Sequence, residues 1–341
     1  MESNAGEQVS RVLDSEDYLD EDDVRVRPNP RGSKPRTKRR PNFDTAPLGM
    51  VLEVHLARYR VLLESGVEVV ATLAKELRKE GAVTCDRVRL AGDTSGEKGS
   101  LARIVRIEPR STQLSRSNEE SEAGEQTIVA NADQLMIVLA SANPEPRSGL
   151  VDRYLVAAYH AGIAPILVMT KCDLKDPAEF VAGFEGFDLK IVKTRSDKPN
   201  LAEIRALLPG HTTVLVGHSG VGKTTLINAI APNFQRATGE VNALTGKGKH
   251  TSSSARAIPI ADGWIVDTPG VRTFGLSGID AAGLLKGFTD LNEAAKDCPR
   301  DCSHLASAPD CELDQKVLQG LIAPARLNSF RRLVDSIGSL D

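Results

Sequence analysis

A glycine-rich segment at residues 217–225 carries the clearest chemical signal in this sequence of 341 residues. It has the spacing G-x-x-x-x-G-K-T, with an apolar run directly before it and a helix-forming run directly after it. Glycines let successive backbone N–H groups converge on phosphate oxygens, and the start of a helix adds its positive dipole end. We therefore expect Lys223 to contact the β- and γ-phosphates of a nucleotide and the Thr224 hydroxyl to bind Mg²⁺. The residues expected to surround the phosphates are Gly217, His218, Ser219, Gly220, Val221, Gly222, Lys223, Thr224 and Thr225.

Two further short motifs also follow apolar runs. Asp267-x-x-Gly270 has the form of a Walker B carboxylate, which would help to hold Mg²⁺, while the Gly270 N–H would contact the γ-phosphate. Thr170-Lys171-x-Asp173 is similar to the guanine-binding N-K-x-D motif of GTPases. There the carboxylate accepts from guanine N1–H and the 2-amino group, which adenine lacks, so Asp173 favours GTP over ATP. Each motif alone is weak, but the three together indicate a GTPase.

The order of these motifs is unusual. Most GTPases place the phosphate loop first and the guanine motif well after it, but here Lys171 precedes Gly217. The chain must therefore begin and end at different points of the same GTPase fold, which is a circular permutation.

A glycine-rich loop at 246–253 lies between the phosphate loop and Asp267, as a switch I loop would. In it, Thr251 is our Mg²⁺ ligand, with Ser252 as an alternative. Val271 stands where Ras-like enzymes carry a water-orienting glutamine, so another group must orient the water. His250 is the nearest candidate, and it joins Lys223 as a catalytic residue. Spacing alone favours the alternative, a loop histidine without a chemical role.

Three cysteines and one histidine cluster near the C-terminus. They are Cys298, Cys302, His304 and Cys311. Three thiolates and one imidazole suit a single tetrahedral, structural Zn²⁺ with no open position for chemistry. The alternative is a set of separate thiols, which the clustering disfavours. Helical apolar spacing at 281–295 and 315–333 predicts a small helical domain around the metal.

The composition suits a globular protein, with 40% hydrophobic and 26% charged residues. No apolar stretch approaches the roughly 20 residues of a membrane-spanning helix, and the N-terminus has no signal-peptide pattern. The net charge of −3 means that nucleic-acid binding would depend on local basic patches. The cysteine pattern fits the reducing cytoplasm.

The first 46 residues are expected to be a disordered tail. Seven acids lie within 14–23, and eight Arg or Lys lie within 24–42 without an acid. The basic block could bind RNA phosphates, or the tail could be solvated with its basic half against its acidic half.

Five short apolar runs within 47–112 predict five strands that form a small barrel, and the OB-fold is a barrel of this kind. Arg103 and Arg106 would suit oligonucleotide binding, and a purely structural barrel is the alternative. The polar, serine-rich stretch 111–126 predicts a linker or mobile loop.

From residue 132 the pattern alternates between strands and helices. Strands are expected at 134–140, 166–169, 189–193, 213–216, 257–260 and 264–266, with helices near 150–158, 201–208 and 226–230. The short hairpin formed by the last two strands delivers Asp267 to the site.

Taken together, the chain resembles the circularly permuted GTPases of small ribosomal subunit biogenesis, the RsgA (YjeQ) family. The motifs that carry the resemblance are the phosphate loop, G-K-H-T at 248–251, D-T-P-G-V-R-T-F-G-L at 267–276, and the Cys/Cys/His/Cys cluster. The resemblance implies GTP hydrolysis that is stimulated by the 30S subunit, with release after late maturation. It also matches His250 to the family's proposed catalytic histidine. Thr170 stands where the family usually has Asn.

The expected fold is α/β, a circularly permuted P-loop GTPase domain with an N-terminal OB-fold barrel and a C-terminal zinc-binding helical domain. The expected domains are the tail (1–46), the OB-fold (47–112), the GTPase domain (126–279) and the zinc domain (280–341). We expect a cytoplasmic monomer with the 30S subunit, 16S rRNA and GTP or GDP as partners, and no membrane. An RNA-binding assembly scaffold with little turnover is the alternative function, and an ATPase or metabolite kinase is disfavoured by Asp173.

Overall fold

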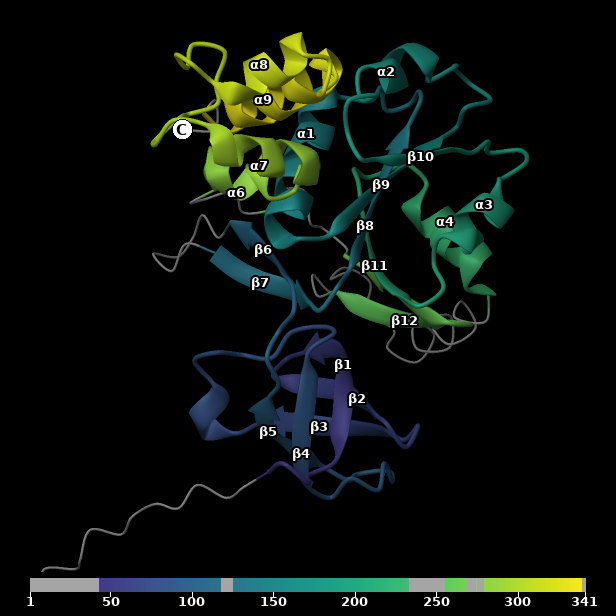
Figure 1. The fold of residues 1–341 in the computed structure, drawn as a ribbon. Helices are drawn as coiled ribbons and strands as arrows, with labels where there is room; N and C mark the ends of the chain where they lie inside the picture. Colours follow the sequence, from purple (N-terminus) through teal and green to yellow (C-terminus); the bar gives the residue numbers. More distant parts are fainter. Residues whose placement is uncertain (1–42, 118–124, 233–254, 269–273, 275–278, 339–341) are drawn as a thin grey trace, which may run out of the picture. The chain divides into compact units, whose positions relative to one another are not determined.

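The computed structural model describes the chain at residues 43–117, 125–232, 255–268, 274 and 279–338. Most of the predicted tail, residues 1–42, lies outside this part of the chain. Figure 1 shows the described elements coloured along the sequence, from the barrel strands to the C-terminal helices.

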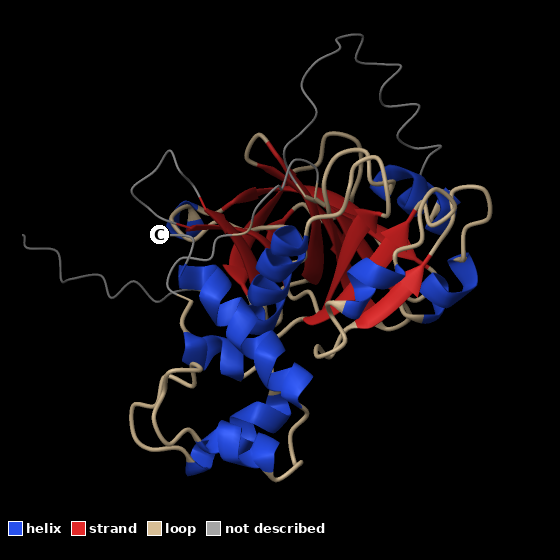
Figure 2. Cartoon of the chain, turned by 90° about the horizontal axis from the view of Figure 1, so that it is seen from above, coloured by secondary structure: helices blue, strands red, loops and turns tan. Residues whose placement is uncertain are grey.

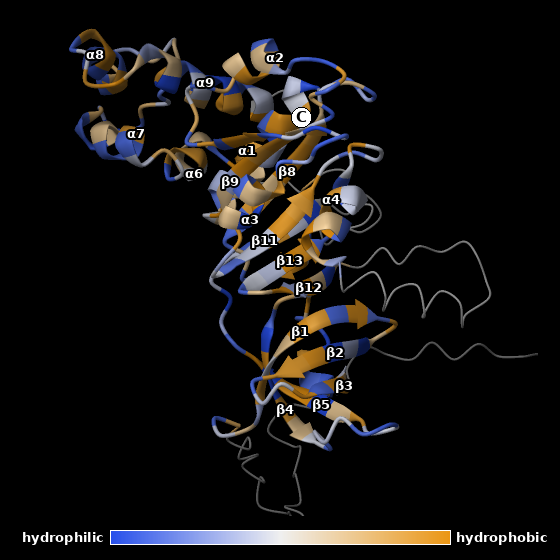
Figure 3. Ribbon diagram, turned by 90° about the vertical axis from the view of Figure 1, so that its right-hand side faces the viewer, coloured by the Kyte–Doolittle hydropathy of each residue, from blue (hydrophilic) through white to orange (hydrophobic). Residues whose placement is uncertain are grey.

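Five short strands close into a barrel. They are β1 (Leu48–His55), β2 (Arg58–Leu63), β3 (Glu68–Leu73), β4 (Arg87–Gly92) and β5 (Ala102–Ile107), with a short 3₁₀ helix, η2 (Lys75–Leu77), after β3. The strands pair in the order β1-β2-β3-β5-β4, and β4 also pairs with β1, which closes the barrel. Alternate residues of β2 (Tyr59, Val61 and Leu63) are buried, and β1 and β2 are mostly orange in Figure 3. This is the OB-fold that the sequence predicts.

Six strands form the sheet that follows. They are β8 (Gln134–Ala140), β9 (Ala164–Thr170), β10 (Lys190–Lys193), β11 (His211–Val216), β12 (Arg256–Ile260) and β13 (Gly263–Asp267). Their spatial order is β10-β9-β8-β11-β13-β12, and only β12 runs antiparallel to its partner β13. Strand β9, which ends at Thr170 of the guanine motif, precedes β11, which leads into the phosphate loop, although both lie in the parallel part of one sheet. The circular permutation predicted from motif order is therefore confirmed.

Side chains of the central strands alternate between two cores. Leu135, Ile137 and Leu139 of β8 belong to the core that includes α1, while Met136 and Val138 belong to the core that includes α3 and α4. The helices are α1 (Ser148–Ala161), α2 (Ala178–Ala182), α3 (Leu201–Ala206) and α4 (Lys223–Ile230). Strands that are apolar on both faces must be covered on both faces, and Figure 2 shows helices on either side of the strands.

The stretch that we expected to be a linker or mobile loop contains a strand. Strand β6 (Gln113–Ser117) pairs antiparallel with β7 (Glu125–Ala130), so the prediction was wrong there. Only Leu114 of β6 is apolar, and it is 2% exposed in the core shared with α1. One inward residue gives no visible alternation, which explains why the pattern did not reveal the strand.

The C-terminal region is helical, as predicted. Its elements are α6 (Ala281–Leu285), α7 (Thr289–Ala294), the 3₁₀ helix η3 (Ala295–Asp297), α8 (Glu312–Leu318) and α9 (Pro324–Gly338). The apolar pattern at 315–333 spans two helices, because Gly320 has φ +70° and ends the first of them. Helix α9 packs on α1, where the Arg332 guanidinium lies 2.9 Å from the buried Asp152 carboxylate. No helix within the described ranges is both long and apolar enough to span a membrane.

Candidate nucleotide-binding site and metal centre

The phosphate loop connects β11 to α4, as its spacing predicts. Gly217 has φ +143°, and a Cβ there would lie 2.2 Å from the Val138 carbonyl oxygen of the neighbouring strand. Gly222, with φ +100°, adopts the left-handed conformation directly before α4. Both positions therefore require glycine, and together they turn the backbone sharply at the helix start.

Lys223 lies inside this loop. Its ammonium donates hydrogen bonds to the carbonyl oxygens of Gly217 and, at 3.1 Å, of His218. Burial lowers the pKa of Lys223, and the nearby Asp267 carboxylate acts in the opposite direction. A partly desolvated ammonium at the centre of a phosphate loop is strongly attracted to phosphate, because little water screens it.

Asp267 lies at the end of β13, in register with Leu215 of β11. Burial raises its pKa, while the charge of Lys223 and a backbone N–H of Thr268 lower it. The Thr268 hydroxyl donates to the Leu215 carbonyl oxygen at 2.8 Å and fixes the chain just beyond the carboxylate. The pairing places this carboxylate beside the strand that leads into the phosphate loop.

Two of the three predicted Mg²⁺ ligands, Thr224 and Asp267, lie within the described residues. Thr224 lies in the first turn of α4 and Asp267 ends β13, and their hydroxyl and carboxylate oxygens are the hard donors that Mg²⁺ prefers. Thr251, Gly270 and the catalytic candidate His250 lie outside the described residues, so their positions stay predictions.

The guanine motif follows β9 at the same edge of the sheet. Lys171 has φ +56°, and its ammonium donates to the Asn143 carbonyl oxygen. The Ser196 backbone N–H donates to the Asp173 carboxylate at 2.7 Å and is the main reason that the pKa of Asp173 lies below its ordinary value. Asp173 is therefore held as a charged acceptor, which is what guanine N1–H and its 2-amino group require.

A cavity of about 160 Å³ lies between the guanine motif and α4. It is lined by Thr170, Lys171, Thr194, Arg195, Ser196, Pro199, Leu201, Val221, Gly222, Thr225, Leu226 and Ala229. The cavity thus joins Thr170 and Lys171 of the guanine motif to the phosphate loop and is the candidate site for the base, although Asp173 is not among its lining residues. A larger hollow of about 700 Å³ beside α1 shares His218 and Val221 of the loop but contains no guanine-motif residue.

The structure also identifies the hydrogen-bond partners of the residues around the guanine motif. The Thr170 hydroxyl lies 2.6 Å from the Val221 carbonyl oxygen and links the guanine motif to the phosphate loop. Arg195, by contrast, is paired with Asp197, with both nitrogen–oxygen distances at 2.8 Å. Ser196 follows the short strand β10, and nothing in its residue type marks it as a partner of Asp173.

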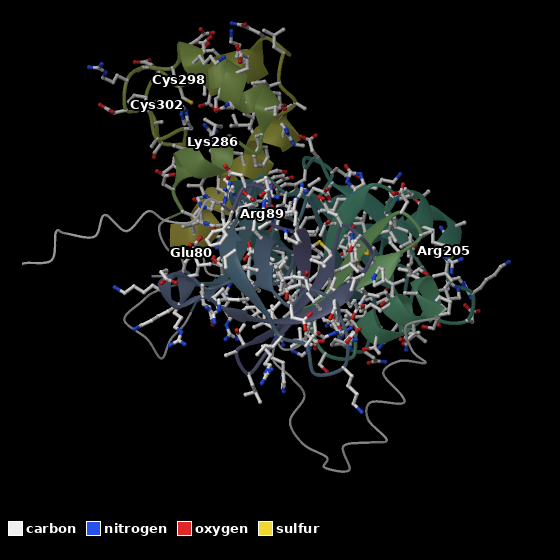
Figure 4. All side chains as sticks on the ribbon, turned by 90° about the horizontal axis from the view of Figure 1, so that it is seen from below. Glu80, Arg89, Arg205, Lys286, Cys298 and Cys302 are labelled. Carbon is white, nitrogen blue, oxygen red and sulfur yellow. The ribbon has the colours of Figure 1, made fainter. Side chains whose placement is uncertain are left out.

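The four candidate zinc ligands converge. The ligand atoms of Cys298, Cys302, His304 and Cys311 all lie within 4.8 Å of one another. His304 Nδ1 lies 3.6 Å from Cys298 Sγ and 3.9 Å from Cys311 Sγ. Ligands around one tetrahedral zinc are separated by roughly 3.6–3.8 Å, so these residues fit that ion. Figure 4 labels Cys298 and Cys302, which lie close together in the helical domain.

Arg331 of α9 supports the loop that carries His304. It donates to the His304 carbonyl oxygen at 3.0 Å and to both oxygens of Asp314, at 2.9 and 2.8 Å. His304 has φ +56°, a conformation that costs a non-glycine residue energy unless its surroundings hold it. The hydrogen bonds of the Arg331 guanidinium thus connect the loop that carries His304 to both α8 and α9.

Replacing Cys302 with alanine should remove zinc and loosen the helices from α6 to α9, because ligand binding contributes directly to folding in such sites. Metal analysis should fall from about one equivalent to near zero, and hydrogen exchange should rise across 281–338, while GDP affinity changes little. Ser303→Ala, in the same loop, is the matched control. Native protein that contains no zinc would contradict the assignment.

The phosphate loop, the Walker B carboxylate and the guanine motif lie at one edge of a sheet whose strands follow one another along the chain in a permuted order. This arrangement defines the chain as a circularly permuted P-loop GTPase.

A family model described as RsgA GTPase matches residues 107–277, and the chain belongs to this family. It is 36% identical over 260 residues to the small ribosomal subunit biogenesis GTPase RsgA of Pseudomonas aeruginosa strain LESB58, covering 72% of this chain and 74% of that one. The protein of the same name from Pseudomonas syringae pv. tomato is 32% identical over 300 residues, covering 85% of each chain. These comparisons confirm the resemblance stated from the motifs.

Two solved structures have a similar fold. The crystal structure of YjeQ from Thermotoga maritima has a TM-score of 0.63 at 25% identity, covering 85% of this chain and 98% of that one. YloQ, described as a circularly permuted GTPase, also has a TM-score of 0.63, at 23% identity and covering 89% and 99% of the two chains. The fold is therefore shared with both solved structures.

Proposed function

We propose that this GTPase binds the small ribosomal subunit in its GTP-bound state, hydrolyses GTP on the subunit during late maturation, and then leaves. The observation that carries the proposal is the joining of a guanine cavity to a phosphate loop in a chain that also has an OB-fold barrel. The names of the curated relatives support the same biological setting.

The chain's own residues divide the work. Lys223 binds the β- and γ-phosphates, and its partial burial strengthens that attraction. Thr224, Thr251 and Asp267 would hold Mg²⁺, which neutralises phosphate charge when it enters with GTP. Gly270 would sense the γ-phosphate through its backbone N–H. Asp173 would select the guanine base. Thr251 and Gly270 lie outside the described residues, so their roles are proposed from the sequence.

His250 is the proposed group that orients or deprotonates the attacking water. The proposal is supported by Val271, which cannot perform this role, and by the family resemblance of the G-K-H-T segment. A histidine near its ordinary pKa can hold or accept a proton at neutral pH. Contact with the ribosomal subunit would place the imidazole beside the water.

The barrel is the proposed contact with 16S rRNA. Arg103 on β5 is exposed and suits a phosphate contact, whereas Arg106 is paired with Asp44 and with Glu108, the latter at 2.9 Å. RNA would have to displace those carboxylates before Arg106 could bind it. We further propose that the protein acts as a monomer in the cytoplasm, where subunits mature, with a single structural zinc.

Guanine selection by Asp173 can be tested by Asp173→Asn. The substitution removes the acceptor for two guanine donors, so affinity for GTP should fall roughly 5- to 100-fold while xanthosine triphosphate, which can accept from the new amide, gains. Affinities would be measured by competition against a fluorescent GDP analogue, with Asp176→Asn as the matched control. Unchanged GTP affinity without a gain for the xanthine nucleotide would refute this role.

Co-sedimentation with purified small subunits tests the proposed function. The full chain should sediment with subunits in the presence of a non-hydrolysable GTP analogue and should largely remain in the supernatant with GDP. Equal sedimentation with both nucleotides would show that subunit binding does not depend on the γ-phosphate, and the proposed cycle would then be wrong.

A further inference from the structure

Thr170 is the last residue of β9 and faces the nucleotide site. It is 8% exposed, and it lines the cavity assigned to the base. A Cβ built on Gly222 of the phosphate loop would lie 3.8 Å from the Thr170 hydroxyl oxygen, so the side chain is directed at the loop. The hydroxyl lies between two backbone carbonyl oxygens, that of Val221 at 2.6 Å and that of Leu139 at 3.2 Å.

A threonine hydroxyl has one hydrogen to donate. Both of its neighbours here are carbonyl oxygens, which can only accept, so the hydrogen is committed to one of them. The 2.6 Å distance indicates that Val221 receives it. Toward the cavity, Thr170 can therefore present oxygen lone pairs and a methyl group, but no hydrogen-bond donor.

Guanine presents two polar edges to such a cavity. Asp173 binds the edge with N1–H and the 2-amino group, which leaves N7, a pure acceptor, on the other edge of the base. An asparagine in place of Thr170 would carry two amide hydrogens and could give one to Val221 and the other to N7. Thr170 can make the first of these contacts only.

We propose that this protein does not recognise N7 of the guanine base, and that its pocket accepts guanine nucleotides altered at position 7. The inference rests on the guanine-binding function proposed above. An N7 lone pair that faces the oxygen lone pairs of Thr170 gains nothing, whereas the C–H of 7-deazaguanine meets the same oxygen without repulsion. GDP and 7-deaza-GDP should thus bind about equally well, with any difference favouring the analogue.

The test compares the two nucleotides by competition against a fluorescent GDP analogue, using the full chain. For the unaltered protein, the ratio of the two dissociation constants should stay within about twofold of one. Thr170→Asn should create a preference for GDP over 7-deaza-GDP of roughly fivefold or more, the effect of one added hydrogen bond. Thr170→Ser, which keeps a single hydroxyl hydrogen, should retain the ratio of the unaltered protein.

A tenfold loss with 7-deaza-GDP in the unaltered protein would overturn the inference, because another donor at the cavity, such as the Thr225 hydroxyl, would then bind N7. This result requires no variant, so poor folding of Thr170→Asn cannot obscure it. Failure of GDP itself to bind would overturn the proposed function as well. Tight GDP binding with a tenfold loss for the analogue would overturn only the present inference.

Discussion

Lys223→Ala should reduce kcat/KM for GTP roughly 10²- to 10³-fold, the usual cost of removing one positioned group from developing charge. The ammonium is partly desolvated within the phosphate loop, where its attraction to phosphate is strong. Its loss would also leave the half-buried Asp267 carboxylate without the opposing charge and next to the incoming phosphates. Because the proposed contact of Lys223 with phosphate exists in both the ground and transition states, GTP affinity and turnover should fall together.

Equilibrium binding and single-turnover hydrolysis, measured separately, test this expectation. Lys286→Ala removes an exposed lysine on the helical domain, labelled in Figure 4, and should leave both quantities unchanged. If Lys223→Ala lowers turnover but preserves GTP affinity, the lysine acts in the transition state alone, and the assigned ground-state contact is wrong.

His250→Ala should remove most of the turnover that small subunits stimulate, a loss of roughly 10²- to 10⁴-fold, as for other positioned general bases. GTP affinity should change little, because the proposed role concerns the attacking water and not the phosphates. The measurement is GTP hydrolysis at saturating subunits, with GTP binding measured in parallel.

His160→Ala, which alters an exposed histidine on α1, is the matched control for loss of an imidazole. Full stimulation of His250→Ala by subunits would show that the ribosome or another residue orients the water. The mechanism proposed here would then be wrong, while the guanine and phosphate assignments would stand.

Much of the fold follows from local patterns in the sequence. Continuous apolar runs predicted β8 and β9, because strands buried on both faces carry no polar alternation. The glycines at 217 and 222 predicted the phosphate loop, and motif order alone predicted the permutation. These features are local or topological, so they are visible without coordinates.

Other features depend on contacts between distant residues. Strand β6 has a single inward apolar residue, Leu114, and its pairing with β7 arises from tertiary packing. Thr170 and Val221 are 51 residues apart, and only the fold brings the hydroxyl to the carbonyl. The same holds for Arg331, whose support of the His304 loop has no sequence signature. Residue types predicted the chemistry, but the hydrogen bonds that position it required the structure.

GTP turnover of the unaltered full chain, with and without purified small ribosomal subunits, tests the central claim most directly. We predict slow turnover by the free protein and a rise of roughly 10²-fold or more at saturating subunits, because the subunit would place the catalytic group beside the water. A turnover rate that subunits leave unchanged, although the protein demonstrably binds them, would contradict the account and favour a nucleotide-dependent assembly scaffold.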